Sequence, residues 1–166
     1  MKILIINGSA HRGNTWKLVE QAKNCLVESQ KEIEFDEVHL IEEGLPFCIG
    51  CSNCFRVGHE KCPHYNVIGK IIEKIETADG IIIATTTYNM RETALLKNLF
   101  DHFCFMLHRP HFFKSKALVI TLQVGLVDMR LLKVLKEHCW ELDLIVAIRS
   151  LGHLLVGMHM YQTTRL

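Results

Sequence analysis

Short apolar runs alternate with longer amphipathic segments along most of the chain. The runs 2–7 (KILIIN), 80–86 (GIIIATT) and 117–124 (ALVITLQV) are continuous and rich in β-branched residues. This pattern is typical of strands that are buried on both faces of a sheet. The run 32–40 alternates loosely and predicts a more exposed strand, and 144–148 (LIVAI) predicts a last strand.

The segments between these runs carry apolar residues at the three- and four-residue spacing of a helix face. They predict four helices, whose apolar positions are Leu18, Val19, Ala22, Cys25 and Leu26 within 14–29; Val67, Ile68, Ile71, Ile72 and Ile75; Leu95, Leu96, Leu99, Phe100 and Phe103; and Leu131, Leu132, Leu135, Cys139 and Leu142. The segment after residue 150 has no clear period and is left unassigned.

Strands that alternate with helices form a parallel sheet with helices on both faces. We therefore predict an α/β fold over 1–166: a single doubly wound, five-stranded domain with strand order 2-1-3-4-5, interrupted by a cysteine-rich loop at 44–63. Ligands of such sheets bind at the carboxyl ends of the strands, near the switch in strand order. The candidate binding loops are 8–15, 85–91 and 121–128.

Composition and charge exclude several classes of protein. Hydrophobic residues make up 49% of the chain, which argues against disorder, and the net charge of +1 gives no basis for binding nucleic acid or an anionic membrane. The sequence shows neither a secretory leader nor an apolar run of transmembrane length. We expect a cytoplasmic protein, in which the seven cysteines are thiols or metal ligands rather than disulfides.

The stretch GSAHRGNT at 8–15 has the glycine spacing of a nucleotide phosphate loop, but Asn14 stands where such a loop has its lysine. Without that lysine the loop cannot serve a triphosphate, and Gly8 and Gly13 do not form a dinucleotide fingerprint. A pocket for one terminal phosphate remains, at the start of a helix. The alternative is a plain strand–helix turn that Asn14 caps.

Two stretches resemble the flavodoxin-like NAD(P)H-dependent FMN reductases. They are GSAHRGNT and ADGIIIATTTYNMRETALLKNLFDH, and the resemblance covers roughly residues 1–125. It departs from the family at Thr86, where a proline is usual, and at 123–128, where small residues are usual.

The resemblance implies an FMN-binding oxidoreductase that passes electrons from NAD(P)H through flavin to a small-molecule or protein acceptor. It implies a homodimer or homotetramer, and hydride transfer to flavin requires no catalytic side chain. The cofactor-binding residues that it implies are Ser9, His11, Arg12, Gly13, Asn14 and Thr15 for the phosphate, and Thr86, Thr87, Tyr88, Asn89, Met90, Thr121 and Gly125 for the ring. A degenerate flavodoxin-like regulator without flavin is the rival interpretation.

The cysteine-rich loop contains Cys48, Cys51, Cys54 and Cys62, in the sequence CIGCSNCFRVGHEKC. A compact triplet with a more distant fourth cysteine is a [4Fe–4S] pattern, and it resembles that of the iron–sulfur flavoproteins, which pair such a cluster with FMN. We expect the four sulfurs to converge at the mouth of the flavin pocket. A zinc site, with His59 or His64 as substitute ligands, and a loop of metal-free thiols remain open. The other cysteines, Cys25, Cys104 and Cys139, are predicted to be core residues.

Overall fold

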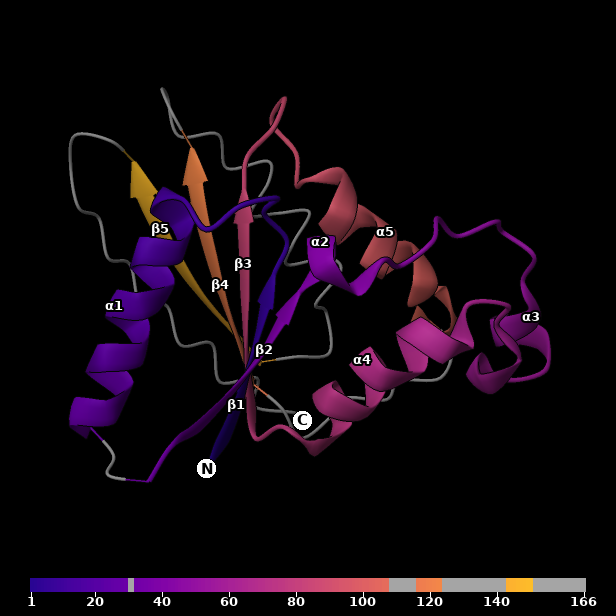
Figure 1. Ribbon diagram of the computed structural model, residues 1–166, viewed down its shortest axis with the longest axis horizontal. Helices are drawn as coiled ribbons and strands as arrows, with labels where there is room; N and C mark the ends of the chain where they lie inside the picture. The colour runs from indigo at the N-terminus through magenta and orange to yellow at the C-terminus, as the bar shows by residue number, and fades with distance from the viewer. Residues whose placement is uncertain (30–31, 108–115, 124–142, 151–166) are drawn as a thin grey trace, which may run out of the picture.

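A parallel sheet runs through the computed structural model, which describes residues 1–29, 32–107, 116–123 and 143–150 (Figure 1). Its strands are β1 Lys2–Asn7, β2 Glu34–His39, β3 Gly80–Thr86, β4 Lys116–Gln123 and β5 Asp143–Ser150. They lie in the order β2-β1-β3-β4-β5, and each neighbouring pair is parallel. The prediction of an α/β fold with β2 and β3 on either side of β1 is confirmed.

Helices cover both faces of this sheet (Figure 1). Ile3 and Ile5 of β1 pack with helix α1 (Asn14–Ser29) on one face. The alternate residues, Leu4 and Ile6, pack on the other face with helices α4 (Tyr65–Thr77) and α5 (Ala94–His102). Full burial of such a side chain contributes about 1.5–3 kcal/mol, so the central strand is held from both sides.

The connection after β2 contains more structure than the sequence predicted. Single turns form α2 (Leu40–Glu43), α3 (Asn53–Arg56) and the 3-10 helix η1 (His59–Lys61), and a further 3-10 turn, η2 (Cys104–Leu107), follows α5. One turn is too short to show a hydrophobic period, which is why the sequence did not reveal these elements. The helix predicted around 131–142 lies outside the described residues.

Hydrogen bonds hold the loop after β1 against β3 and against Thr93, which precedes α5. The Gly8 N–H donates to the Ala84 carbonyl at 2.7 Å, and the Thr93 hydroxyl donates to the Gly8 carbonyl at 2.5 Å. A Cβ atom on Gly8 would lie 2.9 Å from the Cβ of Leu96, so a side chain does not fit there. The loop after β1 and the loop after β3 are thereby fixed at the same edge of the sheet.

Among the helices that the structure describes, none is long and apolar enough to span a bilayer.

Candidate flavin loops and cysteine cavity

The loop at 8–13 leads from β1 directly into the first turn of α1. Helix α1 begins at Asn14, and the Gly13 carbonyl accepts its first hydrogen bond, from the Lys17 N–H at 3.2 Å. Asn14 is therefore the first helical residue and its side chain is exposed, so the alternative in which Asn14 caps the helix is wrong. The helix start directs backbone N–H groups toward the loop, which suits an anion.

Two hydroxyl groups in this loop are buried without a partner. Ser9 and Thr15 are 2% and 1% exposed, and neither Ser9 Oγ nor Thr15 Oγ1 has a hydrogen-bond partner in the described part of the chain. An unsatisfied buried hydroxyl costs about 1–3 kcal/mol, which a ligand with acceptor oxygens would recover. A phosphate group fits this donor set. His11 is exposed beside Gly13, at the rim of the loop.

The Arg12 guanidinium lies close to a ring nitrogen of His39 that cannot accept a hydrogen bond from it. The Asn7 Oδ1 accepts from the Ser9 N–H at 3.0 Å, so Asn7 Nδ2 donates to His39 Nδ1 at 3.2 Å. The His39 proton therefore resides on Nε2, where it donates to Glu37 Oε2 at 3.1 Å. Arg12 Nη2 lies 2.7 Å from that same Nε2, donor against donor. An anion in the neighbouring loop offers the guanidinium a better partner.

The loop after β3 forms a tight hairpin at the same edge of the sheet. Tyr88 and Arg91 exchange two backbone hydrogen bonds of 2.9 and 3.0 Å, and Asn89 and Met90 between them have φ of 49° and 64°. This turn holds the Tyr88 and Met90 side chains out toward solvent, each about half exposed. The Tyr88 ring and the Met90 thioether offer a surface against which a planar ring system can pack.

Threonine side chains connect this hairpin to β4. The hydroxyls of Thr87 and Thr121 lie 3.2 Å apart, and the Thr87 N–H donates to the Leu122 carbonyl at 3.2 Å. Thr86 Oγ1 is buried with no partner among the residues described. The structure thus brings Thr86, Thr87 and Thr121 together at the carboxyl ends of β3 and β4, while Gly125 lies outside the described residues.

Glu92 is a buried acid at this edge that the sequence did not single out. It is 8% exposed, and its Oε2 has no hydrogen-bond partner within the described ranges. It directly precedes Thr93, whose hydroxyl accepts from the Leu96 N–H and caps α5. A glutamate before a helix resembles an ordinary favourable charge at the positive end of the dipole, so the sequence carries no signal of its burial.

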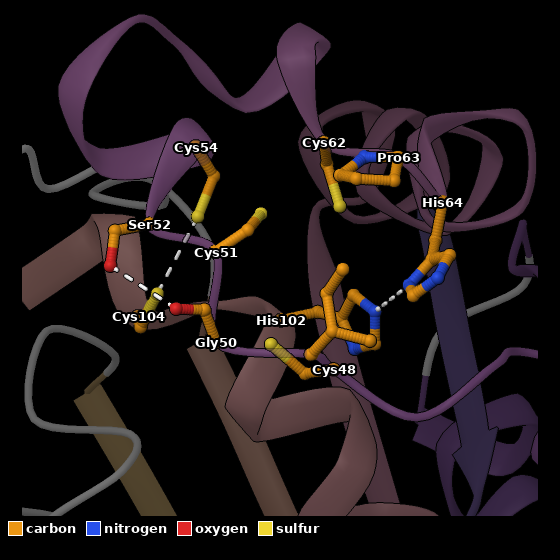
Figure 2. Close-up of a pocket in the computed structure, with 11 residues that line it drawn as sticks. Cys48, Gly50, Cys51, Ser52, Cys54, Cys62, Pro63, His64, His102 and Cys104 are labelled. Carbon is orange, nitrogen blue, oxygen red and sulfur yellow. Dashed lines mark hydrogen bonds between the residues drawn. The ribbon is translucent and has the colours of Figure 1, made fainter.

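The cysteine-rich loop folds around a small cavity of about 40 Å³. Figure 2 shows the four predicted cysteines around this space, with Cys48 and Cys51 on the irregular stretch between α2 and α3, Cys54 on α3 and Cys62 after η1. The predicted convergence of these residues is observed. Two left-handed positions turn the chain between these cysteines, at Gly50 with a φ of 66° and at Ser52 with a φ of 59°.

Two residues that were not predicted to be part of the site, Cys104 and His102, also line this cavity, and so does His64, a proposed substitute ligand. Cys104 packs against the core as expected, and its Sγ also lies 3.5 Å from Cys54 Sγ. His64 and His102 lie on the opposite wall, with His64 Nδ1 and His102 Nε2 3.1 Å apart (Figure 2). Cys104 and His102 come from η2 and the end of α5, so only the tertiary fold brings them to the loop.

The remaining histidine and cysteine predictions differ from the structure in two places. His59, a proposed substitute ligand, does not line the cavity and stacks on Phe105 with ring centroids 5.1 Å apart. Cys25 is exposed on α1, so its prediction as a core residue is wrong. Its position at the edge of the apolar stripe of an amphipathic helix explains the error. Cys139 lies outside the described residues.

Burial shapes the chemistry of these thiols. Burial, followed by the hydrogen bond with Cys104, raises the pKa of Cys54 to about 11. Burial likewise raises the pKa of Cys62, and the neighbouring cysteines add to the effect. Such thiols are poor nucleophiles at neutral pH, and a bound metal ion is the ordinary means of deprotonating them. The donor set fits a thiolate-ligated metal centre better than a reactive cysteine.

The cavity and the phosphate loop contact opposite ends of α5. Thr93 at the start of the helix holds Gly8, whereas His102 at its end lines the cavity. Nine helical residues separate the two points by about 13 Å. The cysteines therefore lie one helix length from the phosphate loop, and Figure 1 shows α3 beyond the far ends of α4 and α5. That they lie at the mouth of the flavin pocket stays a prediction.

Comparisons with known proteins indicate the family to which the chain is similar. The family described as NADPH-dependent FMN reductase matches residues 1–151. An iron–sulfur flavoprotein of Methanocaldococcus jannaschii is 39% identical over 102 residues, which are 61% of this chain and 51% of that protein. An iron–sulfur flavoprotein of Methanosarcina thermophila is 32% identical over 126 residues, 75% of this chain and 63% of that protein. This chain spans about half the length of most of the curated relatives it matches.

Solved structures share the fold at low sequence identity. An azoreductase from Bacillus anthracis has a TM-score of 0.70 and 14% identity, and the match covers 90% of this chain and 86% of that one. An FMN-dependent NADH-azoreductase from the same species, solved in complex with FMN, has a TM-score of 0.69 and 15% identity, with 95% and 90% covered.

Proposed function

Because this chain belongs to the NADPH-dependent FMN reductase family, we propose that it binds FMN and passes electrons from NAD(P)H through the flavin to an acceptor. The observation that carries the proposal is the pair of buried hydroxyls without partners, Ser9 Oγ and Thr15 Oγ1, at the start of α1. Bound FMN would supply the hydride-accepting and electron-releasing chemistry, so the chain needs no catalytic acid or base.

The chain's own residues would bind and orient the cofactor. Ser9 and Thr15 would donate to the phosphate together with the free N–H groups of α1, and Arg12 would leave His39 to pair with it. The Tyr88 hairpin would support the ring, and its left-handed Asn89 and Met90 keep the backbone in a fixed turn. Thr86, with its buried unpartnered hydroxyl, replaces the usual proline with a group able to donate to the flavin.

Removal of one unpartnered hydroxyl tests this placement. Thr15→Val should leave the free energy of unfolding of the flavin-free protein unchanged or raise it, because no protein hydrogen bond is lost. The same change should weaken FMN binding by about tenfold, since hydrogen bonds to charged groups contribute about 1.5–3 kcal/mol. Riboflavin, which has no phosphate, should bind more weakly than FMN, and Thr15→Val should not change its affinity.

A matched variant, Thr77→Val at the far end of α4, controls for general effects of the substitution. Fluorescence titration measures both flavins. Equal losses for FMN and riboflavin, or no loss for either, would place the phosphate elsewhere. Anaerobic mixing of the FMN-loaded protein with NADPH or NADH then tests the electron donor by bleaching of the flavin absorbance.

A second candidate function is electron transfer between FMN and a [4Fe–4S] cluster. The convergence of Cys48, Cys51, Cys54 and Cys62 on one cavity favours it, and so does the likeness to iron–sulfur flavoproteins. A cluster there would supply one-electron transfer at a point one helix length from the phosphate loop. The acceptor would then be a one-electron protein or small molecule that reaches the cysteine loop.

Iron analysis tests the cluster. Anaerobically prepared protein should hold about four iron and four sulfide per chain, as the cluster's composition requires. Cys51→Ser should lower both, whereas Cys25→Ser, at an exposed cysteine on α1, should not. Iron-free protein that still binds FMN would leave a plain flavin reductase.

A further inference from the structure

One wall of the cysteine cavity carries a donor set of its own. Potential ligand atoms of Cys62, His64 and His102 all lie within 4.8 Å of one another. They are two imidazoles and a thiol, the combination that zinc and similar divalent ions prefer. Cys51, Cys54 and Cys104 are not members of this set, although they line the same cavity.

The hydrogen bonds of His102 leave one nitrogen ready for a metal. His102 Nδ1 lies 2.9 Å from the Asn98 carbonyl, which can only accept, so this nitrogen carries a proton. The lone pair of the neutral ring is then on Nε2, which faces His64 Nδ1 at 3.1 Å. Metal-binding histidines are typically held in this way, with the second ring nitrogen donating to a carbonyl or carboxylate.

From this geometry we propose that Cys62, His64 and His102 form a binding site for a single divalent ion of the zinc class. When the ion binds, the proton of His64 moves from Nδ1 to Nε2 so that Nδ1 can coordinate, and the Cys62 thiol proton is released to solvent. A tetrahedral zinc requires about 3.3–3.6 Å between neighbouring donor atoms. The two nitrogens are already near that spacing, and the sulfur must approach by at most about 1.5 Å.

This site and an iron–sulfur cluster would compete for Cys62, but they differ in every other ligand. The zinc-class site requires His64 and His102, whereas the cluster requires Cys51 and Cys54. The inference therefore does not rest on the proposed flavin or cluster chemistry, and the variants that test the two proposals are different.

Metal titration of the reduced, metal-free full chain tests the site. Zinc affinity is measured by competition with a chromophoric chelator, for the wild type and for single variants. We expect the wild type to bind one zinc per chain. Loss of a hydrogen-bond partner of a metal ligand typically lowers metal affinity by about 10–100-fold. His64→Ala and His102→Ala remove a ligand itself, so each should weaken zinc binding by more than that. His59→Ala, at the loop histidine that stacks on Phe105, and Cys51→Ser should bind zinc like the wild type.

X-ray absorption of the zinc-loaded wild type supplies a readout that needs no variant. Two nitrogen donors with imidazole scattering and at least one sulfur support the proposal. Four sulfurs, absence of zinc binding, or a loss in Cys51→Ser without a loss in His102→Ala overturns it. Iron reconstitution of His102→Ala separates the two proposals, because a cluster on the cysteines should still form in that variant.

Discussion

Asn98 is the residue on which the cysteine loop depends. Its Oδ1 accepts from the Cys48 N–H, and its Nδ2 donates to the Leu45 and Pro46 carbonyls, all at 3.1 Å. Its own carbonyl orients His102. This buried residue thus ties the start of the cysteine loop to α5 through its side chain and orients His102 through its backbone.

Asn98→Asp should lower the free energy of unfolding of the metal-free protein by about 2–4 kcal/mol, because a carboxylate oxygen then faces two carbonyls that have lost their donor. Asn66→Asp, at an exposed asparagine of α4, is the matched control and should change it by less than about 0.5 kcal/mol. Urea denaturation measures both. A loss no larger than that of the control would mean that the loop does not depend on this amide.

At the residue scale, the sequence predicted the site residues that lie at a regular spacing in one loop, and it missed those that only the tertiary fold brings to that loop. The spacing of Cys48, Cys51 and Cys54 already indicated a shared centre. Cys104 and His102 gave no such signal, because they are about fifty residues away in the chain and join the cavity only when α5 packs against the loop. The buried Glu92 was missed because a glutamate that precedes a helix gives no signal of burial.

At the scale of elements, an ion pair joins α4 to the edge strand β2. Lys74 Nζ lies 2.8 Å from Asp36 Oδ1, and this hydrogen bond is the main reason that the pKa of Asp36 is lowered. A carboxyl whose pKa is lower in the folded than in the unfolded chain stabilises the fold above its unfolded pKa. That stabilisation disappears as the pH falls through the folded pKa.

Lys74→Met should therefore destabilise the protein by about 0.2–1 kcal/mol at pH 7, since the pair is partly exposed. The difference from the wild type should shrink as the pH falls through the lowered folded pKa of Asp36, and it should vanish once Asp36 is protonated in both states. Denaturation at a series of pH values measures it, with Lys70→Met, at an exposed lysine of the same helix, as control. A cost independent of pH would assign the effect to packing instead.

Elements with a full hydrophobic period were predictable, and single turns were not. The predicted helix at 14–29 agrees with α1, and the run 80–86 agrees with β3, because each buries a long regular face. The cysteine loop was expected to be irregular, but it contains α3 and η1. Their conformation depends on the left-handed Ser52 and on packing against η2, neither of which a local pattern encodes.

At the scale of the whole molecule, α5 connects the two candidate sites. Its first turn supports the phosphate loop and its last turn supports the cysteine cavity. The alternation of strands and helices predicted the first site, because parallel topology dictates which edge binds ligands. The second site depends on where a long connection packs, which topology alone does not determine. That all of 1–166 forms one domain stays a prediction.

Apolar side chains on the outer surface of the cysteine loop favour self-association. Phe47 and Val57 are 74% and 64% exposed, and neither lines the cavity. Exposed apolar groups that gather on one loop are typical of a protein interface, and the family resemblance implies a homodimer or homotetramer. We therefore propose that a second copy of this chain covers this surface.

Light scattering coupled to size-exclusion chromatography tests that proposal. The wild type should elute with at least twice the mass of one chain, and Phe47→Ser combined with Val57→Ser should shift it toward the monomer, because the buried apolar area is lost. Val27→Ser, at a half-exposed position on α1 across the sheet, is the control and should not change the mass. Iron content and FMN affinity are measured on the same samples, so that dissociation is distinguished from collapse of the loop. A monomeric wild type, or a control that dissociates while the loop variant does not, would show that the interface lies elsewhere or does not form.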